Sequence, residues 1–538
     1  MINESTQVQE LHAMPESLGA LIDDKAALLG DKPVCVFFDE GVSLTYRELA
    51  EYSSRLAHSL LQIGVRKGTH VAVMIPNLPA FPITWLALAK IGAVIVPVNV
   101  SYKSEEFSYV LNDSDTQFLI IDESCLETYR SMSRRPELLT DDRVIVRGAG
   151  GESAWHNWDQ LCASGSPEFT PPEAVTKSDL CNIQYTSGTT GFPKGCMLSH
   201  HYWLLLGHTG SAGSVLRGHS IENILVTNPF FYMGGQSHLM LTLFFNGTAY
   251  IARRSSTSRF LGWVRRYKIH YCSFPEIVLK NTPPSPADTD NELCFVNAYL
   301  YKSEAHFELE RRFNVVGRDS FAMTEIGLGT FVPTEATHMV GSGSCGLAAP
   351  FRELQVVNED GQEVPRGEVG ELWVAGPGMF WGYYKKPAAN AESFRGKWFR
   401  TGDLVYQDDS GYIYVVGRIK EMIKRSGENI SAREVEAVLC EHPEILEAGA
   451  VPVPDEIRNE EVKAYVILRE GLTKEKVTPE QIFAHCAAKL AKFKIPRYLA
   501  YVQEFPRTPS NKIAKKQLIT ASGDLRIGAY DRIDGIWR

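Results

Sequence analysis

The amino-acid sequence predicts an α/β protein, with a large N-terminal domain of α/β subdomains and a β-rich subdomain, followed by a small α+β C-terminal domain. Three observations predict this fold class. Short apolar runs rich in β-branched residues alternate with helix-like segments as far as residue 330, strand-like runs and turns dominate from residue 351, and helix-capping patterns return after residue 418. The length of 538 residues allows several folding units at about 100 to 200 residues per domain.

The first helix with a clear start signal follows Thr45, which forms a capping box with Glu48. Apolar residues then recur at helical spacing over residues 49–63, and Gly64 marks the end. The strand-like runs that follow are continuously apolar, which is typical of strands buried on both faces of a parallel sheet. We expect strands at 71–75, 93–100, 118–121, 224–226, 249–252 and 272–274, and helices at 85–91 and 104–111.

The C-terminal part of the chain predicts a second domain. We place the boundary at Arg418, so that residues 1–418 form the N-terminal domain and residues 419–538 the C-terminal domain. Before the boundary, the expected strands are 354–357, 371–374 and 412–419. After it, we expect capping boxes at Ser431 with Glu434 and at Thr478 with Gln481, and strands at 462–468 and 498–502.

Composition excludes several function classes. The formal net charge of −9 offers no overall attraction to nucleic acid or to an anionic membrane. The N-terminal residues lack the basic start and apolar run of a signal peptide, and Lys90 and two prolines interrupt the most apolar stretch, 81–100, so we expect no membrane span and a cytoplasmic location. The ten cysteines form no CxxC pair, which favours reduced structural thiols over zinc ligands.

The segment YTSGTTGFPKG, residues 185–195, carries the parts of a phosphate-binding loop: hydroxyl groups, glycines that let backbone N–H groups approach a ligand, and the cation Lys194. It does not match the P-loop pattern, because no Ser or Thr follows the lysine. It resembles the phosphate loop of the adenylate-forming superfamily, which includes acyl-CoA synthetases. The resemblance implies that the loop binds ATP through Thr186, Ser187, Gly188, Thr189, Thr190, Gly191 and Lys194.

A second glycine-rich segment, residues 341–346, matches the GxGxxG pattern of dinucleotide-binding folds. That fingerprint should follow a strand and open a helix. Here a strand-like run follows instead, so we interpret the segment as a plain glycine-rich turn.

The segment from Phe321 to Glu325, FAMTE, resembles the superfamily's Tyr-Gly-x-Thr-Glu motif. The resemblance implies that Thr324 meets phosphate oxygens and that Glu325 holds Mg²⁺, a hard cation that prefers carboxylate and phosphate oxygens. It also places ATP against Ser320, Phe321, Ala322 and Met323. Two positions depart from the motif, since Phe321 lacks the usual phenol and Ala322 replaces a glycine beside the acyl pocket.

Three further segments resemble the family's ribose site, hinge and catalytic turn. By resemblance, Asp403 of the WFRTGD segment accepts hydrogen bonds from both ribose hydroxyls, a task that suits the two acceptor oxygens of a carboxylate. Arg418 reaches the ribose, Lys420 is the hinge, and Gly427 admits the pantetheine arm of coenzyme A. Lys512, at the end of a Pro-x-x-x-x-Asn-Lys segment, bridges the substrate carboxylate and the α-phosphate.

Together the motifs imply an acyl-CoA synthetase that uses ATP, Mg²⁺ and coenzyme A to activate a small-molecule carboxylic acid. The expected partners exclude nucleic acid and include a homodimer. The segment around residues 297–304 resembles the carnitine and crotonobetaine CoA ligase subgroup, but the acid itself stays open. The acyl pocket is expected to be lined by Phe231, Tyr232, Gly234, Gly235, Ala298 and Tyr299.

Two alternatives stay open. The first is a ligase that loads a carrier protein instead of coenzyme A, and the second is a non-catalytic nucleotide-binding relative. The residues that discriminate against the second are Glu325 and Lys512, and both are present.

Overall fold

The computed structural model describes residues 9, 11, 13–150, 152–186, 193–211, 216, 218, 220–299, 301, 303–425, 428–508, 512–520 and 523–538. The fold is mixed α/β, as the sequence predicts. The chain divides into two compact units. Unit 1 holds residues 1–186, 193–354 and 374–399, and unit 2 holds residues 187–192, 355–373 and 400–538. We describe each unit by itself.

The first sheet of unit 1 has the strand order β7-β6-β5-β3-β4-β8-β9. Its strands are parallel except for the last pair, in which β8 and β9 run antiparallel. The bounds are β3 His70–Met74, β4 Val94–Pro97, β5 Phe118–Asp122, β6 Val144–Arg147, β7 His156–Asn157, β8 Leu180–Thr186 and β9 Lys194–Ser199. The predicted strands 71–75 and 118–121 are thus confirmed within one residue at each end, whereas the strand predicted at 93–100 is shorter, because β4 ends at Pro97. All three strands are largely buried on both faces.

A second, largely parallel sheet of unit 1 has the order β14-β13-β12-β10-β11-β1-β2, with only β1 and β2 antiparallel among its described pairs. Its bounds are β1 Pro33–Phe37, β2 Val42–Thr45, β10 Asn223–Val226, β11 Thr248–Ile251, β12 Tyr271–Ser273, β13 Phe295–Asn297 and β14 Val316–Arg318. The predicted strands 224–226, 249–252 and 272–274 are therefore confirmed within one residue at each end.

The helices of unit 1 begin where the sequence places caps. Thr45 and Glu48 form the predicted capping box at the start of α3, and Gly64 follows its C-cap with φ +102°. The prediction of a helix at 85–91 starts too late, because α4 already begins at Ala80 and continues through Pro82 in its first turn, where proline is tolerated. Unit 1 contains helices α2 Leu18–Leu29, α3 Tyr46–Gln62, α4 Ala80–Ile91, α5 Ser104–Asp113, α6 Leu126–Arg130, α7 Trp158–Ser164, α8 His200–Thr209, α9 Met233–Phe245, α10 Phe260–Arg266, α11 Glu276–Asn281, α12 Ser303–Phe313 and α13 Pro387–Ser393.

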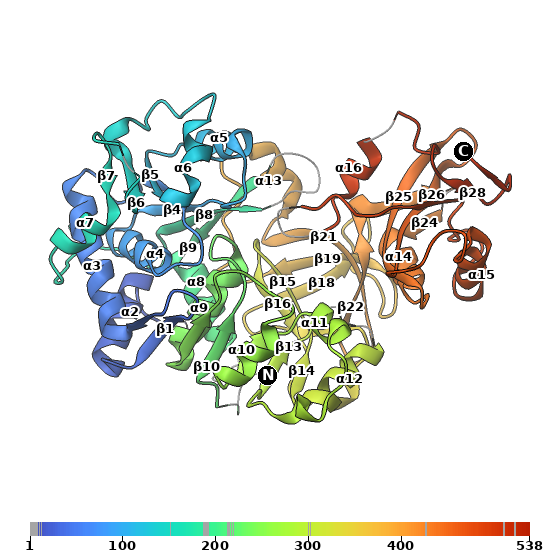
Figure 1. Cartoon of the computed structure of the whole chain (residues 1–538), viewed down its shortest axis with the longest axis horizontal. Coiled ribbons are helices and arrows are strands. Elements are labelled where there is room, and N and C mark those ends of the chain that lie inside the picture. The colour runs from blue at the N-terminus through green and yellow to red at the C-terminus, as the bar shows by residue number, and fades with distance from the viewer. Residues whose placement is uncertain are drawn as a thin grey trace. The chain divides into compact units, whose positions relative to one another are not determined.

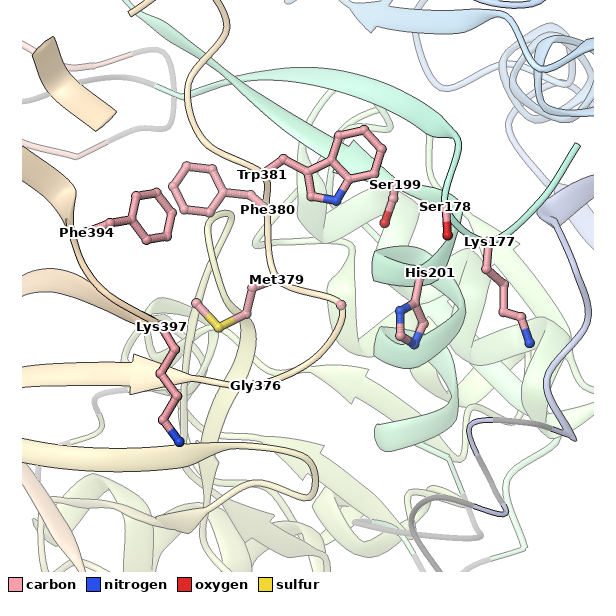
Figure 2. Close-up of a pocket in the computed structure, with 11 residues that line it drawn as sticks. Lys177, Ser178, Ser199, His201, Gly376, Met379, Phe380, Trp381, Phe394 and Lys397 are labelled. Atoms are coloured by element: carbon pink, nitrogen blue, oxygen red, sulfur yellow. The ribbon is translucent and has the colours of Figure 1, made fainter. Parts of the chain in front are cut away.

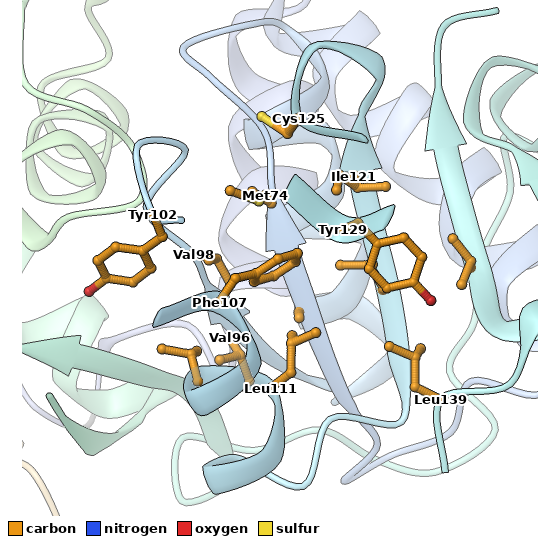
Figure 3. Packing of buried hydrophobic residues seen from close by; sticks show 14 of the residues in the cluster. Met74, Val96, Val98, Tyr102, Phe107, Leu111, Ile121, Cys125, Tyr129 and Leu139 are labelled. Carbon is orange, nitrogen blue, oxygen red and sulfur yellow. The ribbon is translucent and has the colours of Figure 1, made fainter. Parts of the chain in front are cut away.

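Helices α5 and α6 cover one face of the first sheet and build a hydrophobic core with it (Figures 1 and 3). Phe107 and Leu111 of α5 and Tyr129 of α6 pack there with Met74 and Ile121 of the strands, all fully buried. Each such side chain stabilises the fold by about 1.5 to 3 kcal/mol relative to exposure. This core holds the strand ends, from which the loops of the candidate site leave, in fixed places.

A short antiparallel group completes unit 1 and includes the segment that the sequence singles out as FAMTE. Strands β15 Ser320–Met323, β16 Gly327–Phe331 and β17 Ser344–Ala348 pair in that order, and β20 Phe394–Arg395 follows later in the chain. The glycine-rich segment 341–346 leads into β17, and Gly341 and Gly343 have positive φ values of +70° and +79°. The interpretation as a glycine-rich turn is therefore confirmed for residues 341–343, whereas residues 344–346 already belong to β17.

Unit 2 contains an antiparallel group with the order β22-β21-β19-β18 and a C-terminal α+β part with the order β24-β23-β26-β27-β28-β29, in which β25 pairs with β26. The strand bounds are β18 Glu353–Val357, β19 Gly370–Ala375, β21 Trp398–Gln407, β22 Ile413–Arg418, β23 Met422–Arg425, β24 Glu428–Ser431, β25 Ile445–Asp455, β26 Asn459–Leu468, β27 Tyr498–Tyr501, β28 Tyr530–Asp531 and β29 Ile536–Trp537. The helices are α14 Ala432–Cys440, α15 Pro479–Lys489 and α16 Lys515–Thr520.

The two capping boxes predicted for unit 2 have different outcomes. Thr478 and Gln481 form a reciprocal box at the start of α15. At α14, Ser431 accepts a hydrogen bond from the Glu434 backbone N–H, but the Glu434 carboxylate accepts two hydrogen bonds from Lys494 Nζ, at 2.7 and 2.8 Å. A charged donor competes better for this carboxylate than a backbone N–H does.

The residues that the structure describes include no helix long and apolar enough to cross a bilayer. The compact units place residues 400–418 in unit 2. The domain boundary that the sequence predicts at Arg418 stays a prediction.

Candidate active site

The paired strands β8 and β9, which flank the phosphate-loop segment in the sequence, form what we call the neck of the candidate site. The two strands pair in register, with Tyr185 opposite Gly195 and Thr186 opposite Lys194. The Thr186 hydroxyl donates a hydrogen bond to the Lys194 carbonyl oxygen at 3.4 Å. The other loop residues that the sequence predicts, Ser187, Gly188, Thr189, Thr190 and Gly191, lie outside the described residues.

Side chains of α5 hold both sides of this neck. Asp113, the last residue of α5, accepts a hydrogen bond from the Tyr185 hydroxyl at 2.9 Å and an ion-paired hydrogen bond from Lys386. On the other side, the Tyr109 hydroxyl donates to the Pro193 carbonyl oxygen at 3.1 Å. Sequence reasoning missed these residues, because they lie more than 70 positions from their partners in the loop segment.

The segment formed by residues 376–384 runs beside β9 and pairs with it. Trp381 N–H donates to Met197 O at 2.9 Å, Met197 N–H donates to Gly382 O at 3.0 Å, and Tyr384 N–H donates to Gly195 O at 2.8 Å. The 376–384 segment is thereby fixed to the strand that follows the phosphate loop.

Glu325 lies against this segment and is 8% exposed. The Tyr383 hydroxyl donates a hydrogen bond to Glu325 Oε1 at 2.8 Å, and the Phe380 backbone N–H donates to the Glu325 carbonyl oxygen at 3.0 Å. The ammonium of Lys194 lies 4.2 Å from the centroid of the Tyr383 ring, within range of a cation–π contact. The structure therefore brings Glu325 and Lys194, two residues that the sequence predicts, to the same tyrosine.

The rest of the FAMTE segment lies beside Glu325. Ser320, Phe321 and Met323 are half-buried in β15, and Ala322 of the same strand is exposed. Thr324 is half-buried in the turn between β15 and β16.

A cavity of about 90 Å³ lies between α8, α9 and the ends of β12 and β13. Tyr299, which the sequence predicts for the acyl pocket, lines it together with Ser320 and Ala322, which the sequence predicts for ATP. The remaining predicted pocket residues, Phe231, Tyr232, Gly234, Gly235 and Ala298, do not line this cavity.

Helical geometry explains which residues of α9 face the cavity. Met233, Ser237 and Leu241 recur every four residues along one side of the helix and line the cavity with His238. Tyr232 is the N-cap of α9 and lies just before the first of these residues. Its hydroxyl accepts a hydrogen bond from Asn99 at 3.0 Å. Gly235 is needed for packing, because a Cβ there would lie 2.4 Å from the Pro229 carbonyl oxygen.

His238 is a polar wall residue that sequence reasoning missed. Its Nδ1 lies 2.6 Å from the Gly234 carbonyl oxygen, so Nδ1 carries the proton, and Nε2 accepts from the Ser273 hydroxyl at 3.3 Å. Burial lowers the pKa of His238, which keeps the ring neutral near neutral pH. The sequence offered one signal for this residue: His238 lies in an otherwise apolar helix, four residues after Gly234.

Arg318 also lines the cavity, but its charge is already compensated. The guanidinium donates to Glu310 at 2.5 Å and to the carbonyl oxygens of Thr334 and Pro333 at 2.6 and 3.2 Å. The arginine therefore holds β14 to the following chain and contributes little net charge to the cavity.

In unit 2, the predicted pair Asp403 and Arg418 are cross-strand neighbours on β21 and β22. Arg418 donates from Nε to Asp403 Oδ1 at 2.9 Å and from a terminal nitrogen to Oδ2 at 3.2 Å, which makes the pair bidentate. Asp403 is 4% exposed. Burial raises the pKa of its carboxyl, and the Arg418 charge opposes that shift.

Two hydrogen bonds join Lys512 to Thr508 in unit 2. Thr508 N–H donates to the Lys512 carbonyl oxygen at 2.7 Å, and Lys512 N–H donates to the Thr508 hydroxyl at 3.1 Å. Partial loss of hydration and then repulsion from Arg418 lower the pKa of the Lys512 ammonium, while attraction to Asp403 acts in the opposite direction. Asp403, Arg418 and Lys512 therefore influence one another electrostatically.

The remaining predicted residues of unit 2 concern the hinge and the thiol channel. Lys420 lies exposed in the short helix η5 Ile419–Glu421. Gly427 lies outside the described residues.

A second cavity of about 410 Å³ lies on the other side of the 376–384 segment (Figure 2). Ser199 and His201, at the start of α8, line it on one side, and Met379, Phe380 and Trp381 line it on another. None of the residues predicted from sequence line this cavity.

Solved structures of acid–CoA ligases share the fold. An anthranilate CoA ligase in complex with anthranoyl-AMP matches with a TM-score of 0.85 at 22% identity, covering 94% of this chain and 97% of its own. ATP-bound MatB from Rhodopseudomonas palustris matches with a TM-score of 0.83 at 25% identity, covering 94% and 99%. An o-succinylbenzoate CoA synthetase from Bacillus subtilis, in complex with its acyl-adenylate intermediate, matches with a TM-score of 0.78 at 25% identity, covering 93% and 97%.

Sequence comparison gives the same result over nearly the whole length. A crotonobetaine/carnitine–CoA ligase of Salmonella arizonae is 32% identical over 529 residues, which are 95% of this chain and 99% of that protein. A ligase of the same name from Citrobacter koseri is 31% identical over 518 residues, which are 94% and 99%. Residues 22–384 match the family model of the AMP-binding enzymes, and residues 434–512 match that of the AMP-binding enzyme C-terminal domain. The chain therefore belongs to the AMP-binding enzyme family.

Proposed function

We propose that the residues described above carry out the two half-reactions of an AMP-forming acid–CoA ligase. In the first, an oxygen of the substrate carboxylate attacks the α-phosphorus of ATP, and the bond to the β-phosphate oxygen breaks to release pyrophosphate. In the second, the coenzyme A thiol attacks the acyl carbon, loses its proton, and displaces AMP. The observation that supports this most is the convergence of Lys194 and Glu325 on Tyr383, beside the neck of the phosphate loop.

The residues of unit 1 suit a polyphosphate with a divalent cation. We assign the β- and γ-phosphates to Lys194, Thr186 and the loop that follows Thr186. Glu325 fits a Mg²⁺ ligand, because it is an oxygen donor whose side chain and backbone are both held by hydrogen bonds, and Mg²⁺ typically takes one or two carboxylates together with substrate phosphates. When bound, the ion neutralises charge on the phosphate oxygens. Thr324 is assigned to the phosphate oxygens beside it.

The residues of unit 2 suit the ribose and the reacting centre. Asp403 is assigned to the two ribose hydroxyls. A carboxylate offers about four lone-pair positions, so the two hydrogen bonds from Arg418 leave acceptor capacity. Lys512 is assigned to the charge between the carboxylate and the α-phosphate, since attack joins two anions and a point cation lowers that repulsion. Lys420 is assigned to the hinge and Gly427 to the thiol channel.

We assign the acyl group to the cavity lined by Met233, Ser237, His238, Tyr299 and Ala322, with the adenine beside Ser320, Phe321 and Met323. Its wall is mostly apolar, and its histidine is neutral. A volume of about 90 Å³ favours a small acyl group over a long fatty chain. The homodimer and the cytoplasmic location stay predictions.

The test is pyrophosphate release over a panel of small aryl, carnitine-like and fatty acids, each measured with and without coenzyme A. We expect acid-dependent release that is strongest for small acids and an acyl-CoA product when coenzyme A is present. Acid-dependent release with no acyl-CoA product would favour carrier-protein loading. No release with any acid would contradict the ligase assignment.

A further inference from the structure

Tyr383 is buried, and its phenol has a specific partner. The hydroxyl donates to Glu325 Oε1 at 2.8 Å, while the ring packs edge-on against Phe380, with centroids 5.1 Å apart. The ammonium of Lys194 lies over the same ring, and Tyr383 pairs with Cys196 of β9 as an isolated β-bridge. A phenol is ordinarily protonated near neutral pH, so the hydroxyl acts as the donor in this hydrogen bond.

The position of Tyr383 is fixed independently of that hydrogen bond. Three backbone hydrogen bonds join the 376–384 segment to β9, and a fourth joins Tyr383 N–H to the Asn390 side chain at 2.7 Å. The ring contacts with Phe380 and Lys194 do not involve the hydroxyl. The hydroxyl donates to Glu325 and also interacts with the Ser393 side chain, and its contact with Glu325 orients that carboxylate.

We propose that Tyr383 is a positioning residue, which orients the Glu325 carboxylate for a divalent cation that arrives with the nucleotide. The inference rests on the proposed role of Glu325. Partners that hold a ligating carboxylate in place affect metal affinity nearly as strongly as the ligand does. A neutral phenol is suited to this task, because it fixes one oxygen without cancelling the negative charge that the cation needs.

The neighbouring Tyr384 provides a matched control. Its hydroxyl also donates to a carboxylate, Asp115 Oδ2 at 2.8 Å, but this carboxylate is paired with Lys385 at the surface. The variants Tyr383→Phe and Tyr384→Phe therefore each remove one hydroxyl from adjacent residues, and only the first removes a contact with Glu325.

The experiment measures ATP binding by titration calorimetry, once with excess Mg²⁺ and once with EDTA. For Tyr383→Phe we expect Mg²⁺-dependent binding to weaken by about tenfold or more and metal-free binding to stay within about twofold. The buried Glu325 oxygen loses a donor, so the melting temperature should fall, while the fold is kept. Tyr384→Phe should leave both affinities unchanged. Binding of Mn²⁺ in the presence of nucleotide, followed by electron paramagnetic resonance, should show the same difference.

Three results would overturn the inference: unchanged Mg²⁺ dependence in Tyr383→Phe, an equal loss with and without metal, or the same loss in Tyr384→Phe. The variant Glu325→Gln distinguishes a failure of this inference from a failure of the proposed function. If Glu325→Gln binds Mg²⁺ and ATP like the parent, the metal assignment of Glu325 itself is wrong. If Glu325→Gln loses the metal dependence and Tyr383→Phe keeps it, only the positioning role is wrong.

Discussion

Two carboxylates of the candidate site are held in different ways. Glu325 in unit 1 accepts a hydrogen bond from a neutral phenol, that of Tyr383. Asp403 in unit 2 accepts two hydrogen bonds from a cation, the guanidinium of Arg418. Both carboxylates are buried, at 8% and 4% exposure, so burial does not explain the difference.

The difference agrees with the roles proposed for the two groups. A neutral donor orients a carboxylate without itself cancelling the charge, and a metal ion binds through charge. A guanidinium cancels the charge but leaves lone pairs, and ribose hydroxyls need acceptor positions more than charge. The lysines differ as well: Lys194 extends from a paired strand, whereas Lys512 lies exposed in a turn. With the assignments proposed above, unit 1 would hold the polyphosphate in place, and unit 2 would supply the cation Lys512.

The largest effect should come from removing that cation. Lys512→Ala is expected to lower the rate of acid-dependent ATP–pyrophosphate exchange by about 10² to 10³, the range for loss of one preorganised group that stabilises the transition state. The melting temperature should change little, because Lys512 is exposed. Exchange assays and thermal unfolding measure the two effects.

The matched control is Lys516→Ala, an exposed lysine four residues further along the chain. It should keep the parent exchange rate. Equal loss in both variants would mean that the general charge of this region matters and not the position of Lys512.

Much of this fold follows from the sequence because its pattern is local. The parallel strands are short, continuous apolar runs, and the starts of α3 and α15 carry capping boxes. Motif order likewise predicted Glu325, Asp403 and Arg418. In contrast, Tyr383 contacts Glu325 across 58 positions, and no periodicity reports such a contact.

The acyl pocket shows the same limit on a smaller scale. Tyr232 was predicted to line the pocket, but in this segment the residues that line the cavity begin one position later, at Met233. Which side of α9 faces the cavity depends on how the helix starts, and Tyr232 is its N-cap. Gly234 and Gly235 were predicted to line the pocket as well, yet the backbone of Pro229 fills the space beside Gly235.

The second prediction tests the charged partner of Asp403. Arg418→Met removes the group that opposes the rise in the pKa of Asp403, while Arg433, which also lowers this pKa, and Glu421, which raises it, stay in place. The carboxyl should then take up a proton at higher pH, so ATP binding should weaken at a higher pH than in the parent as the solution is acidified. Calorimetric affinities over a pH series measure the shift.

The same change alters stability with a defined sign. A carboxyl whose pKa is raised in the folded state favours folding when protonated and disfavours it when charged. Arg418→Met should therefore be least stable above this pKa and should recover as pH falls. Arg400→Met, which removes the partner of a different buried carboxylate, Glu371, is the control and should not move the acid limb of ATP binding.

A smaller effect is expected where a carboxylate supports the loop neck without touching substrate. Asp113→Ala leaves the buried Tyr185 hydroxyl without its partner, which costs about 1 to 3 kcal/mol of unfolding free energy. We expect the KM for ATP to rise a few-fold while the Mg²⁺ dependence stays normal. Asp115→Ala, which breaks a surface pair with Lys385 and the hydrogen bond from the Tyr384 hydroxyl, should cost about 1 kcal/mol and leave the KM for ATP unchanged. If Asp113→Ala behaves like Asp115→Ala, the neck is held by strand pairing alone.

The smallest effect should come from a cap remote from both carboxylates. Thr45 accepts a hydrogen bond from the Glu48 N–H at 3.1 Å at the start of α3, and Thr45→Ala should lower the unfolding free energy by about 1 kcal/mol. Denaturant unfolding measures this loss, and the kinetic constants should equal those of the parent. This variant calibrates the others, because it shows what a purely structural loss does to the assays. If Thr45→Ala also weakened Mg²⁺-dependent binding, the metal effect expected for Tyr383→Phe would report general stability, and the contrast between the two carboxylates would lose its meaning.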